Sequence, residues 1–206
     1  MRRVGNTAIA AVTVIALGSG AWLLSSGSET ATPPQPSAAE ARTGQARQAP
    51  AAPALPPSPP DRIRIPAIGV DAPLTGLGLT RTGSLDVPPA ADDNLAGWYE
   101  AGTTPGERGT SIVAGHVDNT EGPAVFYRLG ALKKGALIEV DRRDGSVAVF
   151  RVDAVEVYEA QNFPDEKVYG AAHRPELRVI TCGGGYSRST GYQGNVVVFA
   201  HLTGSR

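Results

Sequence analysis

Cys182 is the only cysteine in the 206 residues of the chain, and it ends an apolar run. The run from 176 to 182 is rich in β-branched residues, which is typical of a buried strand. Three glycines, 183–185, follow directly. Glycine has no Cβ, so the backbone after the thiol can come close to another molecule. A lone cysteine is most often a small core residue, and a chemical role for Cys182 therefore depends on its surroundings.

A nucleophilic cysteine needs a basic or cationic neighbour that stabilises the thiolate. The chain has three histidines, which are His116, His173 and His201. His116 ends an apolar segment and follows a glycine, whereas His201 follows an apolar segment close to the C-terminus and His173 lies in a polar stretch. The spacing ranks His116 first and only modestly above His201. Each of them is also compatible with an exposed or capping histidine.

A tetrahedral intermediate at a thiol also needs a hydrogen-bond donor for its oxyanion. Arg188 lies six residues after Cys182, in the segment before the last apolar run. Arg178 lies four residues before the cysteine, so strand alternation points both side chains to one face. Arg206 is terminal. An isolated arginine is more often a solvated surface charge, and the pattern leaves the choice between Arg188 and Arg178 open.

The N-terminal part predicts a membrane element followed by a linker. Arg2 and Arg3 precede the uncharged segment 4–26, which is long enough to cross a bilayer as a helix. The positive-inside rule places the N-terminus in the cytoplasm. We expect residues 1–27 to be an uncleaved anchor; a cleaved signal peptide is the alternative, because residues 18–21 are small. Residues 28–60 are rich in proline and alanine and predict a disordered linker.

Both interpretations of the N-terminus place the rest of the chain outside the cytoplasm, and the anchor that we expect makes it a single-pass protein of the cell membrane. An unpaired thiol there tends to oxidise or to cross-link. Retention of Cys182 in that compartment indicates that the thiol is used.

Residues 61–206 predict one all-β domain. Apolar alternation or apolar runs predict strands at 62–66, 70–79, 83–88, 95–100, 110–116, 136–141, 146–152, 153–158, 178–182 and 196–200. An Asp-Gly hairpin turn is expected at 143–145, and residues 123–132 have helical spacing for about two turns. About eight short strands with one or two short helices in loops predict a closed barrel.

Composition limits the partners. The chain carries 19 Lys and Arg against 20 Asp and Glu, for a net charge of −1, and no basic run is present. This balance argues against nucleic acid as a partner. One cysteine excludes an intrachain disulfide framework and a multi-cysteine metal site. Asp92, Asp93 and Asp118 are loose candidates for calcium ligands, but we expect no metal and no cofactor, and a monomer.

Several motifs resemble those of a known family. The sequence LRVITC at 177–182 resembles the Leu-x-x-x-Thr-Cys strand of sortases, and IVAGH at 112–116 resembles their Ala-Gly-His strand end. Further motifs are similar to those of actinobacterial class F sortases. They are HVD at 116–118, GPAVF at 122–126, TCGG at 181–184, and TG at 190–191 before NVVVFA at 195–200. The resemblance covers about residues 61–203, and the anchor and linker also fit it.

The resemblance implies an eight-stranded sortase-type β-barrel and a cysteine transpeptidase. Cys182 takes the position of the nucleophile and His116 that of the general acid/base. In several sortase classes an arginine stands just before the last apolar run, where this chain has Gly194 and Asn195. We therefore expect Arg188 to take the arginine's role, with Arg178 in reserve. Thr181 and Arg178 are expected to contact substrate.

The family also implies a reaction and its partners. A surface protein with a Leu-Pro-x-Thr-Gly-like sorting signal would be cleaved between Thr and Gly through a thioester. An amine such as a peptidoglycan precursor or a pilin lysine would then accept it. The loop 161–169 is expected to shape the groove that reads the signal.

Two other functions compete with this one. L,D-transpeptidases are also extracytoplasmic β-rich cysteine enzymes, but they carry a Ser-His-Gly-Cys type cluster, which this sequence lacks. A non-catalytic, tethered module for cell-wall binding or assembly is the second alternative. It predicts that Cys182 reacts with an alkylating reagent no faster than a buried thiol does.

Overall fold

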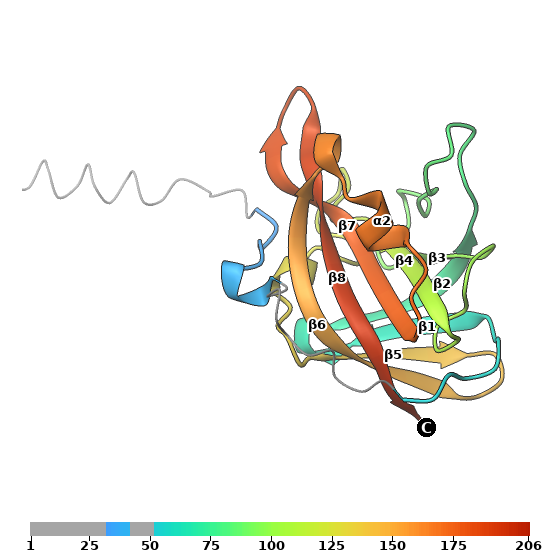
Figure 1. Cartoon of the computed structure of the whole chain (residues 1–206). Coiled ribbons are helices and arrows are strands. Elements are labelled where there is room, and N and C mark those ends of the chain that lie inside the picture. The colour runs from blue at the N-terminus through green and yellow to red at the C-terminus, as the bar shows by residue number, and fades with distance from the viewer. Residues whose placement is uncertain (1–31, 42–51) are drawn as a thin grey trace, which may run out of the picture. The chain divides into compact units, whose positions relative to one another are not determined.

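Alternating and continuous apolar segments give rise to strands between residues 60 and 205 (Figure 1). The computed structural model describes residues 32–41 and 52–206. The predicted anchor at 1–27 and the linker residues 28–31 and 42–51 lie outside this part of the chain. Over the two described ranges, no helix has both the length and the apolar character needed to cross a membrane.

Eight strands are found among the described residues. They are β1 (Pro60–Ile65), β2 (Val70–Leu77), β3 (Ala96–Tyr99), β4 (Gly109–Gly115), β5 (Leu137–Arg142), β6 (Val147–Glu159), β7 (Pro175–Ser187) and β8 (Gly191–Ser205). The helical elements are short and lie outside the sheet. They are the 3₁₀ turns η1 (Ala38–Glu40), η2 (Pro66–Ile68), η3 (Leu129–Ala131) and η4 (Ala160–Asn162), and the helix α2 (Asp165–Tyr169).

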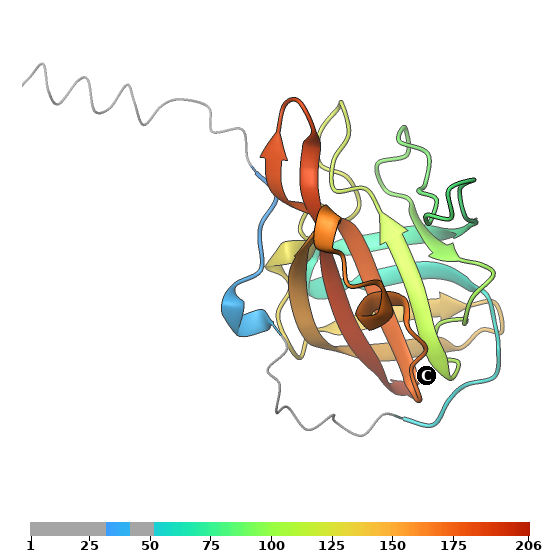
Figure 2. The same ribbon diagram turned by 45° about the horizontal axis from the view of Figure 1, so that its top comes forward.

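The strands close into a barrel in the order β1-β2-β3-β4-β7-β8-β6-β5. Pairing is parallel between β2 and β3 and between β4 and β7, and antiparallel elsewhere. In two views the β7–β8 hairpin projects beyond the barrel wall (Figures 1 and 2). The described part of the chain therefore confirms the predicted eight-stranded all-β barrel.

The barrel has an inner core and a second apolar layer on its outer face. Inward-facing side chains such as Ile63, Phe150 and Leu202 are fully buried in the core. Outside, Ile180 and Phe199 pack with Val168 of α2, so that this helix covers part of β7 and β8. Both faces of these strands are therefore apolar, which explains why they appear as continuous apolar runs.

Local differences from the sequence prediction have identifiable causes. Residues 83–88 form a loop with one isolated bridge, Leu79 to Leu85, because the segment runs into Pro88 and Pro89. The helical spacing at 123–132 yields only the 3₁₀ turn η3. The two strands predicted at 146–158 are one strand, β6, whose register with β8 shifts between Val152 and Ala154. The Asp-Gly turn is confirmed, and Gly145 has the positive φ of 84° that glycine tolerates.

Residues 52–59 pack on the barrel, in contrast to the disordered linker predicted for 28–60. The amide of Ala52 donates to the carbonyl of Leu202, and that of Leu55 to the carbonyl of Gly106. Ser58 is 4% exposed. Proline-rich segments lack backbone donors but keep their carbonyls, and the side chains of Ala52 and Leu55 add contacts to the core. The amino-acid composition of this segment does not predict these contacts.

Candidate active site

The parallel strands β4 and β7 bring His116 and Cys182 to the same end of the barrel wall. Ala114 pairs with Ile180 in this ladder, and the histidine and the cysteine each lie two residues further along. The hydroxyl of Thr181 donates a 2.8 Å hydrogen bond to the carbonyl oxygen of Gly115, which continues the alignment past the last pair. Strand alternation then places both functional side chains on the outer face, with Ala114 and Ile180.

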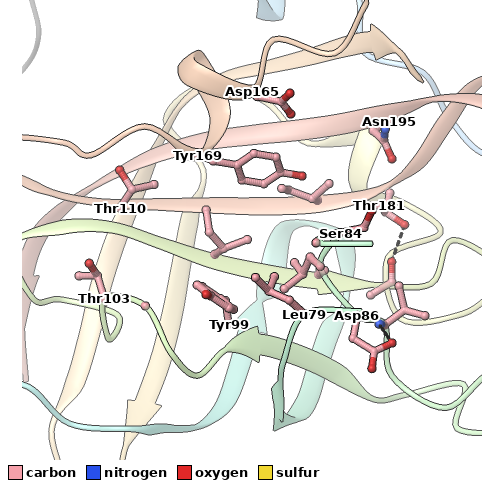
Figure 3. A pocket seen from close by; sticks show the side chains of 18 of the residues that line it. Leu79, Ser84, Asp86, Tyr99, Thr103, Thr110, Asp165, Tyr169, Thr181 and Asn195 are labelled. Carbon is pink, nitrogen blue, oxygen red and sulfur yellow. Dashed lines mark hydrogen bonds between the residues drawn. The ribbon is translucent and has the colours of Figure 1, made fainter. Parts of the chain in front are cut away.

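A groove of about 1040 Å³ runs along this outer face. Its floor is apolar, with Ile112 and Ala114 from β4 and Ile180 from β7. Its walls come from the α2 segment and from the loop between β2 and β3, through residues that include Asp165, Tyr169, Leu79, Leu85 and Val87. Tyr169 lies over the groove in Figure 3. The predicted loop 161–169 therefore contributes to the groove.

The two ends of the groove differ in their chemistry. Cys182 and Asn195 line one end, and Arg108 and Thr110 line the other. Figure 3 shows Thr181 and Asn195 at the first end and Thr110 at the second. An extended peptide that lies along the apolar floor thus reaches the thiol at one end of the groove.

Cys182 has a free thiol on an exposed side chain. The protein around the sulfur removes enough water to raise the pKa of the thiol, and the negative charge of Asp118 raises this pKa further. The thiol is therefore protonated at neutral pH. Attack by this sulfur on a carbonyl carbon requires a base that takes the proton.

His116 is half-buried at the end of β4 and is oriented by a backbone group. Its Nε2 lies 2.7 Å from the carbonyl oxygen of Pro88, in the loop between β2 and β3. A carbonyl oxygen can only accept, so Nε2 carries a hydrogen in both the neutral and the charged ring. Proton exchange with a reacting group then falls to Nδ1.

The structure does not bring Arg188 to the groove. Arg188 is exposed in the turn 188–190 at the tip of the β7–β8 hairpin. The two strands stay paired beyond Cys182 as far as Ser187 and Gly191. At roughly 3.3 Å per residue, this ribbon carries the turn roughly 15 Å past the thiol. A separation of six residues in the sequence suggests a short loop between Cys182 and Arg188. Because this segment is an extended, paired strand, it holds Arg188 far from the thiol.

Arg178 and Thr181 are both occupied by contacts within the protein. Arg178 is 4% exposed, forms a 2.8 Å ion pair with Glu176, and stacks its guanidinium over the ring of Phe199. It shares the face of Cys182, as alternation predicts, but α2 and its flanking segments cover that part of the face. Thr181 is also 4% exposed, and its hydroxyl proton is donated to Gly115.

The other predicted ligands and histidines lie elsewhere. His201 is 2% exposed, and its Nδ1 lies 2.7 Å from a carboxylate oxygen of Asp153. The carbonyl of His173 accepts a hydrogen bond from Arg108. Asp118 accepts a hydrogen bond from the Tyr192 phenol. Over residues 32–41 and 52–206, no three His, Cys, Asp or Glu side chains are placed to hold a metal ion. The prediction that no metal is needed stays a prediction.

Sequence reasoning missed the contributions of Pro88, Tyr192 and Asn195. The carbonyl of Pro88 left no signal, because any residue type supplies one. Asn195 was noticed only as a departure from an expected arginine, whereas the structure pairs it directly with Cys182 across the ladder between β7 and β8. The register of that hairpin, which no local motif specifies, is the missing information.

Comparison with known proteins agrees with this fold. A family model described as a sortase domain matches residues 63–203. No match was found among curated proteins.

Solved structures with a similar fold include three from different bacteria. Sortase A of Listeria monocytogenes has 16% identity and a TM-score of 0.53, covering 72% of this chain and 90% of that chain. A Clostridium perfringens sortase D5 transpeptidase has 21% identity and a TM-score of 0.52, covering 71% and 79%. Sortase A of Corynebacterium diphtheriae, as a lid mutant, has 18% identity and a TM-score of 0.54, covering 70% of both chains. At these identities the likeness is one of fold.

Proposed function

Because the chain belongs to the sortase family and is a sortase-type cysteine transpeptidase, we propose that it cleaves a Leu-Pro-x-Thr-Gly-like sorting signal between Thr and Gly. The observation that carries this proposal is the common end of the paired strands β4 and β7, where His116 follows β4 and Cys182 lines one end of an apolar groove. An apolar floor of Ile112, Ala114 and Ile180 suits the Leu-Pro part of such a signal.

In the first half-reaction the Cys182 thiol gives its proton to Nδ1 of His116. The sulfur attacks the threonine carbonyl carbon, and the carbonyl electron pair moves to the oxygen. When the tetrahedral intermediate collapses, the carbon–nitrogen bond breaks. The imidazolium returns the proton to the leaving glycine amine, and the surface protein remains as a thioester on Cys182.

In the second half-reaction an amine attacks the thioester. The acceptor's proton passes to His116, a new amide bond forms, and the sulfur leaves and regains a proton. We propose a peptidoglycan precursor or a pilin lysine as the acceptor class. The 2.7 Å contact of His116 with Pro88 supports this scheme, because it keeps the ring in one orientation through both proton transfers.

We further propose that the enzyme is of class F and acts on the extracytoplasmic side of the cell membrane as a single-pass protein. The motifs at 116–118, 122–126 and 181–184 support the class. The uncharged segment at 4–26 supports the anchor.

The test is cleavage of a Leu-Pro-x-Thr-Gly peptide by the purified full-length chain in detergent, with release of the Gly fragment as the measurement. Cys182→Ala should abolish thioester formation. His116→Ala should reduce turnover by about 10²–10⁴-fold, which is typical of a removed acid/base group. Thr110→Ser, at the far end of the groove, is the control. Undiminished turnover by Cys182→Ala would falsify the proposal.

A further inference from the structure

The oxyanion that forms at Cys182 needs a hydrogen-bond donor next to the sulfur. Both arginines suggested by the sequence are elsewhere: Arg188 is at the hairpin tip, and Arg178 is buried in an ion pair with Glu176. The donor has to come from residues that line the thiol end of the groove.

Most polar groups at that end are already engaged. The hydroxyl proton of Thr181 goes to Gly115, and Nε2 of His116 faces the carbonyl of Pro88. Ser84 also lines the groove, but it belongs to the loop between β2 and β3, and no strand pairing links that loop to Cys182. A hydrogen-bond donor for the oxyanion has to be in place before the oxyanion forms, and a rigid strand holds it there better than a loop does.

Asn195 meets these requirements. It is the direct partner of Cys182 in the antiparallel ladder of β7 and β8, so the two side chains stand on one face with their Cβ atoms about 5 Å apart. Both residues line the groove, and Asn195 is half-buried there. No hydrogen bond joins its side-chain amide to any residue in the described part of the chain, so both of its N–H groups are available.

We propose that the side-chain amide of Asn195 donates to the oxygen of the carbonyl attacked by Cys182, and that Asn195 is the oxyanion donor in place of an arginine. This inference rests on the proposed function. The amide is neutral, so it stabilises the oxyanion without placing a full positive charge beside the thiol. That agrees with a thiol whose pKa is raised by burial and by Asp118.

The inference is tested by peptide cleavage with the full-length chain and four variants, one of which is Arg188→Ala. Asn195→Ala should lower kcat/KM by roughly 10²–10³-fold, the usual loss for a removed oxyanion donor. Asn195→Asp has nearly the same shape but puts an acceptor and a charge at the oxyanion, so its activity should fall further. Gln193→Ala removes an exposed amide from the same strand outside the groove and should retain wild-type activity.

Alkylation of Cys182 by iodoacetamide separates a donor role from a structural one, because that reaction forms no oxyanion. Asn195→Ala should alkylate at the wild-type rate and melt at the wild-type temperature. If Asn195→Ala keeps the wild-type kcat/KM, or if Arg188→Ala loses most of it instead, the inference about Asn195 is wrong while the proposed function stands. A wild-type chain that cleaves no peptide overturns the proposed function, and the inference with it.

Discussion

The phenol of Tyr192 donates a hydrogen bond to the carboxylate of Asp118. This bond joins two segments that are distant in sequence, the first turn after His116 and the β7–β8 hairpin. The ring of Tyr192 also packs on Tyr186 across the hairpin, with 5.1 Å between centroids. The carboxylate fixes the hairpin that carries Cys182 and at the same time places a negative charge near the thiol. The geometry and the acidity of the Cys182 thiol thus both depend on Asp118.

Asp118→Asn should make Cys182 more acidic. The Asp118 charge is one of the two causes that raise the pKa of the thiol, and burial, the larger cause, remains in the variant. The pKa of the thiol should therefore fall, and the pH profile of iodoacetamide alkylation should shift to lower pH. The asparagine oxygen still accepts from Tyr192, so the hairpin contact survives the change.

Tyr192→Phe is the matched control for this prediction. It removes the hydrogen bond but leaves the Asp118 charge in place, so the alkylation profile should not move to lower pH. If Asp118→Asn leaves the profile where it is, or if both variants shift it equally, the carboxylate does not set the acidity of the thiol.

The side-by-side ends of β4 and β7 could be predicted in part from the sequence. Apolar runs that end in Gly115-His116 and Thr181-Cys182 carry a strong local signal, and both strands are buried on two faces. Their parallel pairing is a property of the whole barrel order, which local patterns do not specify. The resemblance to a family implied an eight-stranded barrel, and the structure adds the order of its strands.

The donor opposite Cys182 could not be predicted for a physical reason. Strand pairing of the β7–β8 hairpin continues far beyond the cysteine and includes an irregularity between Gly183 and Tyr186. A one-residue change in such a register moves a side chain to the other face. The sequence could name arginines near Cys182, but it could not show that Arg188 lies at the tip while Asn195 faces the thiol.

Thr181→Val should destabilise the barrel, because it removes the 2.8 Å hydrogen bond to Gly115 while it keeps the size of the side chain. The loss in free energy of unfolding is expected to be about 1 kcal/mol or more, since the bond is buried. Urea unfolding measures it. Thr181→Ser keeps the hydroxyl, so its free energy of unfolding should be closer to that of the wild type. If Thr181→Ser is less stable than Thr181→Val, the hydrogen bond to Gly115 does not stabilise the barrel.

Glu176 should make stability depend on pH. Burial disfavours its charged form, but hydrogen bonds from Arg174 and Arg178 outweigh burial and lower the pKa of the carboxyl. Because this pKa is lowered on folding, the contribution of Glu176 to the free energy of unfolding is complete above its pKa in the unfolded chain, about 4.3. The contribution is lost as the pH falls through its pKa in the folded protein. At pH 7, Glu176→Gln should cost about 1.5–3 kcal/mol in urea unfolding, and this difference from the wild type should shrink toward pH 3. Glu121→Gln, at an exposed site, should cost nothing at either pH.

Gly130→Ala should release residues 33–41 from the barrel. Gly130 is buried, and a Cβ at this position would overlap the carbonyl oxygen of Pro34. The same segment accepts hydrogen bonds from the backbone amides of Lys134, through Glu40, and of Gly184, through Gln35. A lost bond to a charged group is worth about 1.5–3 kcal/mol, so exchange of the Lys134 amide should become roughly tenfold faster or more.

Hydrogen exchange of the Lys134 and Gly184 amides is the measurement for this change. Gly204→Ala is the control, because a Cβ there meets nothing within 4 Å and the segment should stay bound. Gly184 lies two residues after Cys182, so release of the segment also frees a backbone amide close to the thiol. If both amides keep their wild-type protection in Gly130→Ala, residues 33–41 do not depend on the absence of a side chain at position 130.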